Sequence, residues 1–596
     1  MRFPALRSAL IAAAAFTLPA FASSSCRGTP PVTSAATAAG AGPAVPARRT
    51  ASFPEGWRFR AGEPGATFGA HAMIASNSAL ASAAGVEVMR AGGNAVDAAV
   101  ATGFALAVTF PQAGNLGGGG FTIIRMADGR TAAIDYREVA PLAASRDMYL
   151  KPGVAPEASI TGPLASGVPG AVAGLTAMQA RFGRLPLARV LAPAIRLAEE
   201  GFAVDSALMR SFQWDSARFA PYASSVAAFY PGGRPPAYGS TFRQPDLART
   251  LRRIAERGAD GFYKGETASL VEAEMKRDGG LITAEDLARY KPVWRDALVV
   301  PYRGYTLITM PPVSSGGTTI AETLNILETY DSLPPVGSAV YTHILGSAYQ
   351  RAFTDRNSKL GDPAFVTVPV AELTSKAYAR RVRQTIDAGH YTPTRSLPGA
   401  GNEKTQTTHY SVVDADGNAV STTTTLNNSF GSAVTVGGAG FLLNDEMDDF
   451  AAHPGQPNMF GLVEGAQNEI APGKRMLSSM SPTIVLDPRG GLLLAVGAAG
   501  GPTIITATAQ VVLNVVDGRM TLADAMRAPR IHHQALPDSL VIEHDGLRPA
   551  VRDSLTAMGY RFIERDAIAN VNAVMRVKGG WEGMHEPRSV GGAVGY

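Results

Sequence analysis

The spacing of apolar residues predicts where regular structure begins in this chain of 596 residues. Over residues 76–91 apolar positions recur with a helical period, and glycines at 92 and 93 end the pattern. Asn94 can cap a second helix, because its short side chain accepts hydrogen bonds from the free amides of a first turn. Upstream, residues 23–65 are rich in Ala, Gly, Pro, Ser and Thr and lack apolar periodicity, so we expect a flexible leader there.

Strands and helices then segregate along the sequence. Alternating apolar and polar residues predict a hairpin at 121–126 and 131–136, whereas residues 185–400 are predicted to be mainly helical. After residue 406 the pattern favours one helix, 503–516, among antiparallel strands at 409–413, 419–426, 483–486, 492–496 and 571–577. Helices, then strands, then helix favour sheets sandwiched between helical layers.

Composition narrows the class of protein. Hydrophobic residues make up 46% of the chain and charged residues 17%, which is typical of a globular protein with a large core. The net charge is only +4, and Lys and Arg are scattered rather than clustered. Nucleic-acid binding is therefore not expected.

The first residues have the pattern of an export signal. Two arginines flank a short start, an apolar run spans 9–18, and small residues at 20 and 22 suit cleavage, so residues 1–22 are predicted to be a signal peptide. No later segment reaches the roughly 18 uninterrupted apolar residues of a membrane span. We expect an exported protein, periplasmic or secreted. Lipoprotein anchoring through Cys26, the single cysteine, is less favoured because the usual large aliphatic residue before it is missing.

Several common catalytic motifs are absent from the sequence. It contains no Gly-x-Ser-x-Gly, no phosphate-binding Gly-x-x-x-x-Gly-Lys-Ser/Thr and no His-Glu-x-x-His. The nine histidines lack the spacing of metal ligands, since His532-His533 is the only adjacent pair. Gly117–Gly120 matches a dinucleotide fingerprint poorly and favours a tight start to a strand. We expect neither a metal nor an organic cofactor.

One set of polar residues remains as a candidate site. Gln406-Thr407-Thr408 begins a predicted strand, and alternation would place Thr423, Thr425 and Asn427 in one row on a strand face. Four acids follow within residues 443–449. Ser478-Ser479 precedes an apolar strand, and the bare amides of Gly500-Gly501, at a strand-to-helix turn, could point at an oxyanion.

These stretches resemble the gamma-glutamyltranspeptidases, which are N-terminal-nucleophile hydrolases. Residues 406–414 are similar to the self-cleavage site of that family, and similar blocks occur in order at 92–99, 111–120, 135–138, 443–450, 474–482 and 586–589. The resemblance covers most of the chain. It implies an α+β fold, a four-layer αββα sandwich built from two autocleaved subunits, a large one of residues 66–406 and a small catalytic one of residues 407–596.

Thr407 can be argued as the nucleophile on chemical grounds. A threonine hydroxyl reacts only when a base takes its proton. Cleavage between Gln406 and Thr407 creates an α-amine on the same residue, with a reference pKa of about 7.7–8.0, so no histidine is needed. The same hydroxyl would first attack the carbonyl of Gln406 to give an ester that water opens. By resemblance, Thr425 would hydrogen-bond this hydroxyl, and Gly500 and Gly501 would supply oxyanion-hole amides.

The resemblance also implies how a donor is held. A gamma-glutamyl group presents an α-carboxylate and an α-amino group, and a guanidinium fork suits the former. The residues that match the family's carboxylate-binding positions are Arg137, Ser478 and Ser479, and those that match the amino-binding positions are Asn427, Glu446 and Asp449. One position departs from the family: bacterial members often carry a tyrosine over the pocket where this chain has Phe460, which cannot donate a hydrogen bond to Asn427.

The expected reaction is hydrolysis and transfer of gamma-glutamyl groups from glutathione-like donors, to water or to amino acid and peptide amines. One alternative is an acylase of the same fold that removes glutaryl groups from cephalosporin-type amides. Such substrates lack the amino group and would leave Glu446 and Asp449 without a cationic partner. An inactive exported binding protein is the other alternative, and the intact Gln406-Thr407, Thr425 and Gly500-Gly501 disfavour it.

Overall fold

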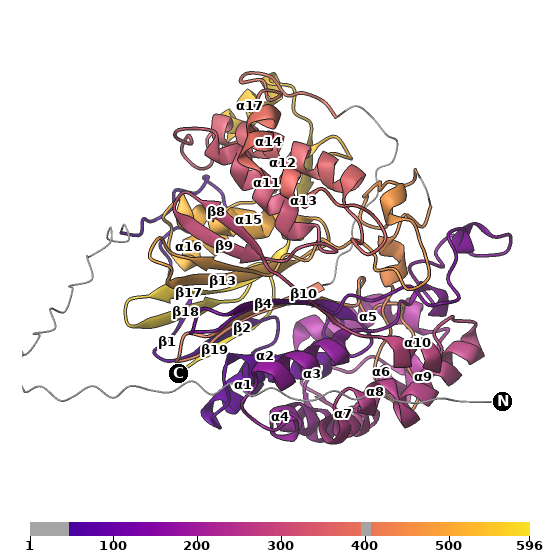
Figure 1. The fold of residues 1–596 in the computed structure, drawn as a ribbon. Coiled ribbons are helices and arrows are strands. Elements are labelled where there is room, and N and C mark those ends of the chain that lie inside the picture. Colours follow the sequence, from indigo (N-terminus) through magenta and orange to yellow (C-terminus); the bar gives the residue numbers. More distant parts are fainter. Residues whose placement is uncertain (1–46, 395–406, 454) are drawn as a thin grey trace, which may run out of the picture. The chain divides into compact units, whose positions relative to one another are not determined.

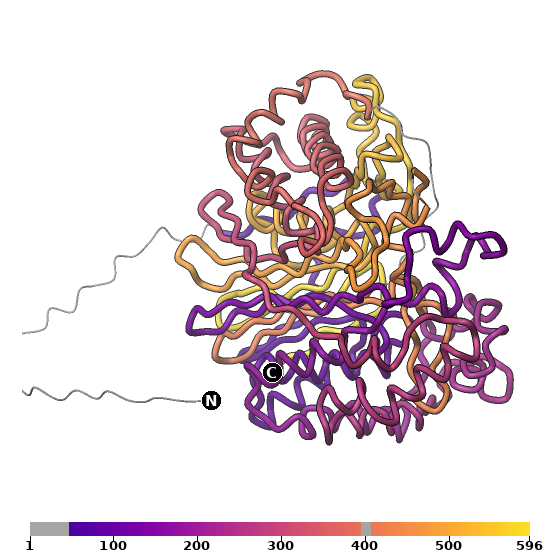
Figure 2. Tube along the Cα trace, turned by 45° about the vertical axis from the view of Figure 1, so that its right-hand side comes forward, coloured from indigo at the N-terminus to yellow at the C-terminus, as the bar shows by residue number. Residues whose placement is uncertain are grey.

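The computed structural model describes residues 47–394, 407–453 and 455–596. The predicted signal peptide, Cys26 and Gln406 lie outside these residues. Two seven-stranded sheets lie face to face, and helices cover the outer face of each (Figure 1). The same four layers are seen along the Cα trace in Figure 2. The predicted αββα sandwich is therefore confirmed. None of the helices in the described part of the chain is long and apolar enough to cross a membrane.

The sheet that contains Thr407 is called the β10 sheet here. Its neighbouring strands are antiparallel and follow the order β19 (Gly592–Gly595), β2 (Met73–Ser76), β10 (Thr407–Val413), β11 (Ala419–Thr425), β3 (Gly119–Arg125), β4 (Thr131–Asp135) and β7 (Val293–Arg295).

The second sheet, the β13 sheet, is also antiparallel throughout. Its order is β1 (Thr67–Gly69), β18 (Gly580–Met584), β17 (Asn570–Val577), β13 (Leu492–Ala499), β12 (Thr483–Leu486), β9 (Tyr305–Thr309) and β8 (Leu298–Tyr302). Each sheet contains strands that precede residue 406 in the sequence and strands that follow it. Two pieces made by a cut there would stay interleaved.

The helices form the two outer layers. Those on the side of the β10 sheet are α1 (Ala79–Arg90), α2 (Ala95–Thr109), α3 (Ala171–Phe182), α4 (Leu187–Glu200), α5 (Ser206–Phe219), α6 (Ala223–Phe229), α7 (Pro245–Arg257), α8 (Asp260–Tyr263), α9 (Gly265–Asp278) and α10 (Ala284–Arg289). Those on the side of the β13 sheet are α11 (Gly316–Glu328), α12 (Ala339–Lys359), α13 (Val370–Leu373), α14 (Lys376–Arg383), α15 (Thr503–Val516), α16 (Leu522–Arg527) and α17 (Pro549–Ala557).

Two small sheets complete the described part of the fold. One consists of β5 (Phe202–Ala203) and β6 (Thr241–Phe242), and the other of β14 (Ile531–His532), β15 (Leu540–Glu543) and β16 (Phe562–Arg565).

Local signals placed the first two helices well. Asn94 accepts hydrogen bonds from the amides of Val96 and Asp97, and the Asp97 carboxylate accepts from the Asn94 amide, which completes a capping box. The α2 helix that follows is buried along its whole length. The preceding helix, α1, begins at Ala79 rather than at residue 76, because Ser78 adopts an extended backbone and caps it.

Alternation along β10 decides which way Thr407 faces. Tyr410 and Val412 pack into the apolar layer between the β10 sheet and its helices. His409 and Ser411 lie on the opposite face, toward the β13 sheet, where the Ser411 hydroxyl donates to the Asn572 carbonyl at 3.4 Å. Because side chains on a strand alternate with a period of two, Thr407 shares the face of His409, between the sheets.

Two regions differ from the expectation. Residues 293–309 were included in the mainly helical stretch, but they form β7, β8 and β9 at sheet edges. These strands are short, and β4 and β12, which pair with β7 and β9, are distant in sequence. β8 and β9 also pair with each other across a tight turn at Arg303-Gly304, so this hairpin was a local signal that the prediction missed.

The described end of the expected leader, residues 47–65, is packed rather than free. The Trp57 indole donates to the Arg527 carbonyl at 3.0 Å, and the amides of Ala51 and Gly62 both donate to the Asp524 carboxylate, at 2.9 and 2.8 Å. Composition favoured flexibility, but these long-range acceptors fix the segment against the C-terminal part of the chain.

Candidate active site

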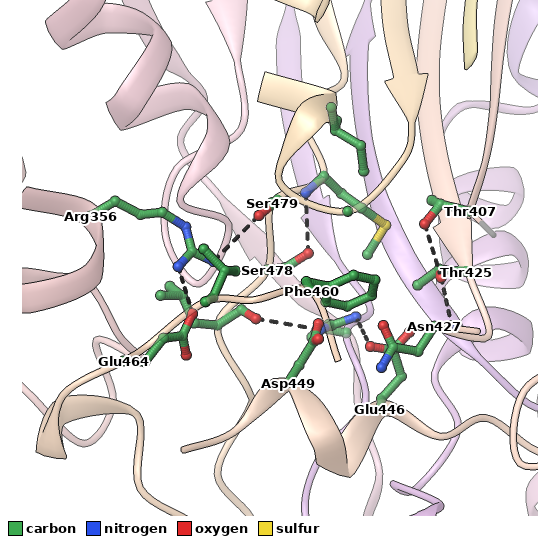
Figure 3. Close-up of a pocket in the computed structure, with 16 residues that line it drawn as sticks. Arg356, Thr407, Thr425, Asn427, Glu446, Asp449, Phe460, Glu464, Ser478 and Ser479 are labelled. Atoms are coloured by element: carbon green, nitrogen blue, oxygen red, sulfur yellow. Dashed lines mark hydrogen bonds and ion pairs between the residues drawn. The ribbon is translucent and has the colours of Figure 1, made fainter. Parts of the chain in front are cut away.

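Thr407 and Thr425 face each other at the ends of paired strands. They are directly opposed in the β10–β11 register, and their hydroxyl oxygens are 3.3 Å apart (Figure 3). The Thr425 hydroxyl also accepts a hydrogen bond from the backbone amide of Asn427 at 2.7 Å. Accepting there leaves its hydrogen free to be donated to Thr407.

Asn427 is not part of the strand row that alternation predicted. The strand β11 ends at Thr425, and Asn427 has a left-handed backbone with φ 81°. This turn carries its side chain toward the acidic segment, where the amide group donates to the Asp445 carbonyl at 3.1 Å. Asparagine tolerates the left-handed region better than most residues do.

Glycines allow the chain to close tightly behind the two threonines. A Cβ atom on Gly118 would lie 2.0 Å from the Thr425 carbonyl oxygen, and one on Gly120 would lie 2.5 Å from that of Thr423. The predicted tight start to a strand is correct, because β3 begins at Gly119 and pairs with β11. The glycine run thus holds the backbone of Thr425 in place rather than binding a nucleotide.

A second glycine pair lies at the junction of β13 and α15. Gly500 has φ 133° and Gly501 φ 54°, both in the region that favours glycine. A Cβ atom on Gly500 would also lie 2.6 Å from the Thr503 hydroxyl. Gly501 faces the same pocket as Thr407, at the N-terminal end of α15, where helix amides favour negative charge.

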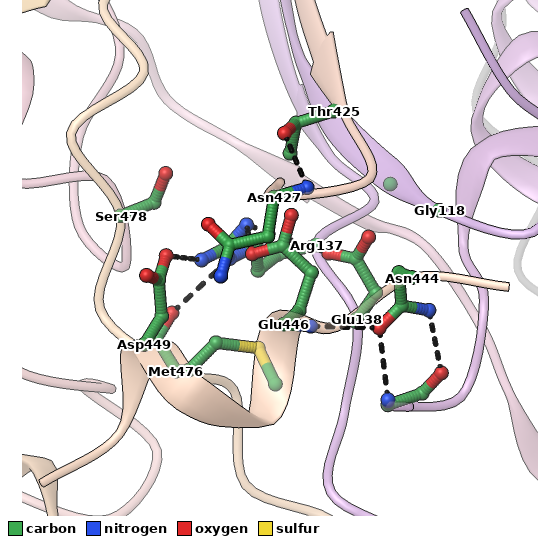
Figure 4. Close-up of polar contacts among 12 residues, drawn as sticks. Gly118, Arg137, Glu138, Thr425, Asn427, Asn444, Glu446, Asp449, Met476 and Ser478 are labelled. Carbon is green, nitrogen blue, oxygen red and sulfur yellow. Dashed lines mark hydrogen bonds and ion pairs between the residues drawn. The ribbon is translucent and has the colours of Figure 1, made fainter. Parts of the chain in front are cut away.

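A charged cluster forms the far end of this pocket. Arg137, just after β4, is almost completely buried and lies 2.5 Å from the Glu446 carboxylate, in contact with Asp449 and 3.5 Å from Glu138 (Figure 4). Residues 446–449 form a single 3₁₀ turn. Because side chains three residues apart align in such a turn, Glu446 and Asp449 both reach Arg137.

Acidic side chains outnumber basic ones in this cluster. Burial would lower the pKa of Arg137, but Glu446, Asp449 and Glu138 raise it above its usual value. Burial raises the pKa of Glu446 and of Asp449 even though Arg137 opposes the shift, and it raises the pKa of Glu138 to about 7. Three carboxylates around one guanidinium leave this end short of cations.

Ser478 and Ser479 both use their side-chain oxygens as acceptors. The Ser478 hydroxyl accepts from the Met480 amide at 3.2 Å, and the Ser479 hydroxyl accepts from Arg356 at 3.3 Å. In the described part of the chain neither hydroxyl hydrogen has a protein acceptor. Both serines can therefore donate to an anion in the pocket.

The pocket unites most of the predicted site. Every described residue that was predicted to have a catalytic or donor-binding role lines it except Gly500, which is adjacent to the lining residue Gly501. Its cavity volume is about 20 Å³, and Phe460 is among the residues that line it. The lining residues are Arg137, Arg356, Thr407, Thr425, Asn427, Glu446, Asp449, Phe460, Leu462, Glu464, Leu477, Ser478, Ser479, Met480, Gly501 and Ile504.

Arg356 and Glu464 were missed by the sequence analysis. Arg356 follows Tyr349 and Phe353 at helical spacing on α12 and precedes Leu360, and all four are buried. An arginine inside an apolar stripe needs a buried partner, and this was the available signal. Glu464, 2.5 Å away, is that partner, but nothing near it in sequence indicates the pairing.

Histidine is absent from the lining of the pocket. His409 lies two residues from Thr407 but is held between the hydroxyls of Thr423, at 2.9 Å, and Ser411, at 3.0 Å. Burial lowers the pKa of His409 to about 3, so the ring is neutral near pH 7. The described residues also contain no cluster of side chains that could hold a metal ion.

Comparison with known proteins adds independent findings. A model of the gamma-glutamyltranspeptidase family matches residues 81–596. The glutathione hydrolase proenzyme of Escherichia coli (strain K12) is 47% identical over 526 residues, 87% of this chain and 90% of that protein.

Solved structures give similar results. The cephalosporin acylase from Bacillus halodurans superposes with a TM-score of 0.81 at 27% identity, over 91% of this chain and 99% of that chain. A chain of Helicobacter pylori gamma-glutamyltranspeptidase, 46% identical, superposes with a TM-score of 0.52 over 53% of this chain and 92% of that chain.

Proposed function

Since this chain belongs to the gamma-glutamyltranspeptidase family, we propose that it cleaves itself between Gln406 and Thr407 and then transfers gamma-glutamyl groups through an ester on Thr407. Glutathione and related gamma-glutamyl amides are the proposed donors, and water or an amino acid or peptide amine is the acceptor. The observation that carries this proposal is the arrangement of the nucleophile, an excess of buried carboxylates and one buried guanidinium in a single pocket.

Maturation needs only the end of the pocket that contains Thr407, Thr425 and Gly501, called the reaction end here. The Thr407 hydroxyl attacks the carbonyl carbon of Gln406, the C–N bond breaks, and the Thr407 nitrogen takes the proton. Water then opens the ester, which leaves a carboxylate on Gln406 and a free α-amine on Thr407. Turnover repeats the same attack on the donor amide, with the α-amine as base. The leaving amine takes the proton, and the second nucleophile releases the gamma-glutamyl group.

The geometry favours a substrate that carries both charges at its far end. Arg137 is paired with Glu446 and Asp449. An amino-acid head group could replace these pairs on both sides, its carboxylate binding Arg137, Ser478 and Ser479 while its ammonium binds Asp449, Glu446 and Asn427. Every buried charge then keeps a partner, as burial requires.

A glutaryl donor would satisfy only half of this cluster. Its single carboxylate could take Arg137 from the two acids, but Glu446 and Asp449 would lose their nearest cation and gain none. Leaving a buried charge unpaired is strongly unfavourable. The resemblance to a cephalosporin acylase keeps glutaryl amides as the second candidate, and this charge balance favours gamma-glutamyl amides.

The proposed precursor has an export signal followed by two subunits. We propose export with residues 1–22 as signal peptide, residues 66–406 as the large subunit and residues 407–596 as the small one. The interleaved sheets support a stable heterodimer of these two pieces.

A gel and one assay test the proposal. Purified wild-type protein should run as two bands under denaturing conditions, and gamma-glutamyl-p-nitroanilide should be cleaved faster when glycylglycine is present. A single uncut band together with no release of nitroaniline would favour an inactive binding protein. Faster cleavage of glutaryl-p-nitroanilide than of its gamma-glutamyl counterpart would favour the acylase.

A further inference from the structure

Arg356, on α12, contacts Ser315, Glu464 and Ser479, and the last two line the pocket. One terminal nitrogen donates to Glu464 at 2.5 Å, and the other donates to Ser479 at 3.3 Å (Figure 3). The Nε atom donates to the Ser315 hydroxyl at 3.1 Å. Ser315 in turn donates to the Ser478 carbonyl at 2.6 Å. One buried guanidinium thus contacts one of the two adjacent serines directly and the other through Ser315.

These contacts fix the direction of the serine hydroxyls. Because the Ser479 oxygen accepts from Arg356, its own hydrogen must point elsewhere, and the pocket is the side left open. Ser315 holds the backbone of Ser478 from behind. Arg356 thereby prepares both serines as donors before any anion enters.

Arg356 also holds residues 459–464, called the covering segment here, three of which line the pocket. Residues 459–464 include Phe460, which lines the pocket and is only 5% exposed. The phenyl ring offers no hydrogen bond to Asn427, whose side-chain amide donates to the Met459 sulfur at 3.7 Å instead. The segment is also attached by the Met459 backbone amide, which donates to Asp448 at 3.0 Å, by Glu464, and by the Phe460 carbonyl, which accepts from Gln534 at 3.1 Å. The Arg356–Glu464 pair is the buried ionic attachment of this segment.

We propose that Arg356 is a positioning residue for donor recognition: it orients Ser478 and Ser479 toward the donor carboxylate and fastens the covering segment through Glu464. This inference rests on the proposed function and adds to it. Direct binding of the donor carboxylate by Arg356 is the competing role. Four of the five guanidinium N–H groups already have protein partners: Asn357 accepts a fourth hydrogen bond at 2.9 Å, besides the three to Ser315, Glu464 and Ser479. Glu464 also neutralises the charge of Arg356, which disfavours direct binding of the donor.

Arg356→Lys tests the positioning role. Lysine can keep the pair with Glu464 but cannot reach Ser315, Ser479 and Glu464 together, because it lacks the planar fork. With gamma-glutamyl-p-nitroanilide we expect KM to rise about tenfold while kcat changes little, the size of one lost charged hydrogen bond. With 4-aminobutyryl-p-nitroanilide, which lacks the α-carboxylate, kcat/KM should be nearly unchanged. Equal losses on both anilides would overturn the proposal, since they would indicate general damage.

Glu464→Gln separates the positioning role from direct binding, because the two roles predict opposite changes in KM. If Glu464 fastens the covering segment, its loss should raise KM for the gamma-glutamyl anilide and speed hydrogen–deuterium exchange of residues 459–465. If Arg356 binds the donor directly, freeing its charge should lower KM, and that result would contradict us.

Arg253→Lys is the matched control for Arg356→Lys. Arg253 is a buried arginine on α7 that also contacts hydroxyls and one carboxylate, but it does not line the pocket. Its kinetics should equal those of wild type. The wild-type assay separates the two levels of inference: an inactive wild type refutes the proposed function, whereas an active wild type with unchanged Arg356→Lys and Glu464→Gln variants refutes only the positioning role.

Discussion

The two ends of the pocket are built from different chemistry. At one end Thr407, Thr425 and Gly501 present hydroxyls and a backbone turn with no ionisable side chain. At the other end Arg137 lies among three carboxylates, two of them fully buried (Figure 4). Two serine hydroxyls there are free to donate. The difference teaches that reaction and recognition can be separated in this molecule. Self-cleavage and turnover share the first end, whereas only a donor with a charged head group uses the second.

Replacing the nucleophile should have the largest effect, on both reactions at once. Thr407→Ala removes the hydroxyl that attacks Gln406 and the donor alike, so the variant should run as one uncut band and release no nitroaniline above the enzyme-free rate. Thr407→Ser keeps a hydroxyl and should retain part of both activities. Two bands from the alanine variant would show that another group performs the cut.

Arg137→Lys should damage turnover alone. Lysine keeps the charge but cannot make the two-pronged contact with a carboxylate, and a lost charge-assisted contact of about 1.5–3 kcal/mol corresponds to roughly ten- to hundredfold in kcat/KM. Processing on a gel should be normal, because no donor carboxylate takes part in it. A failure to mature would mean that the two ends are not separable; Arg253→Lys controls for the same change at a remote buried site.

Asp449→Asn should narrow the preference for gamma-glutamyl over glutaryl anilides, by about tenfold if one charged hydrogen bond is lost. The loss should fall on the gamma-glutamyl substrate, whose ammonium loses an anion. Asp448 is the control next to it: it accepts hydrogen bonds from Ser159 and from the Met459 amide of the covering segment, so its loss should affect both anilides alike. Asp448→Asn should leave the ratio of the two kcat/KM values intact, and an unchanged ratio in both variants would remove the amine-reading role of Asp449.

His409→Gln should have the smallest effect, on the pH profile. The reaction end has no titrating side chain, so the acid limb of kcat/KM should follow the α-amine, whose reference pKa is about 7.7–8.0. Activity is lost as pH falls and the amine becomes protonated. His409, with a pKa lowered to about 3 by burial, is neutral across pH 6–9 and cannot produce this limb. A shifted limb in the variant would identify the imidazole as a base.

Local sequence determined much of the frame of this molecule. The capping box at Asn94, the hairpin of β10 and β11 and the helix 503–516 follow from residues within a few positions of each other, and the structure confirms them. The tight strand start at 117–120 and the turn at Gly500-Gly501 could also be predicted, because glycine permits the close approach and the left-handed backbone observed there. The sequence likewise singled out Thr407 and the residues that share its pocket, through ordered blocks that resemble one family.

Only the tertiary structure decided how the charges are partnered. It pairs Arg137 with Glu446 and Asp449 across more than 300 residues of sequence, and Arg356 with Glu464 across 108. It also anchors Trp57 at Arg527 and turns Asn427 out of the strand row. The physical reason is the same in each case. Helix caps and turns are satisfied by near neighbours, whereas a buried charge or amide accepts any partner that the packing of distant elements brings within reach.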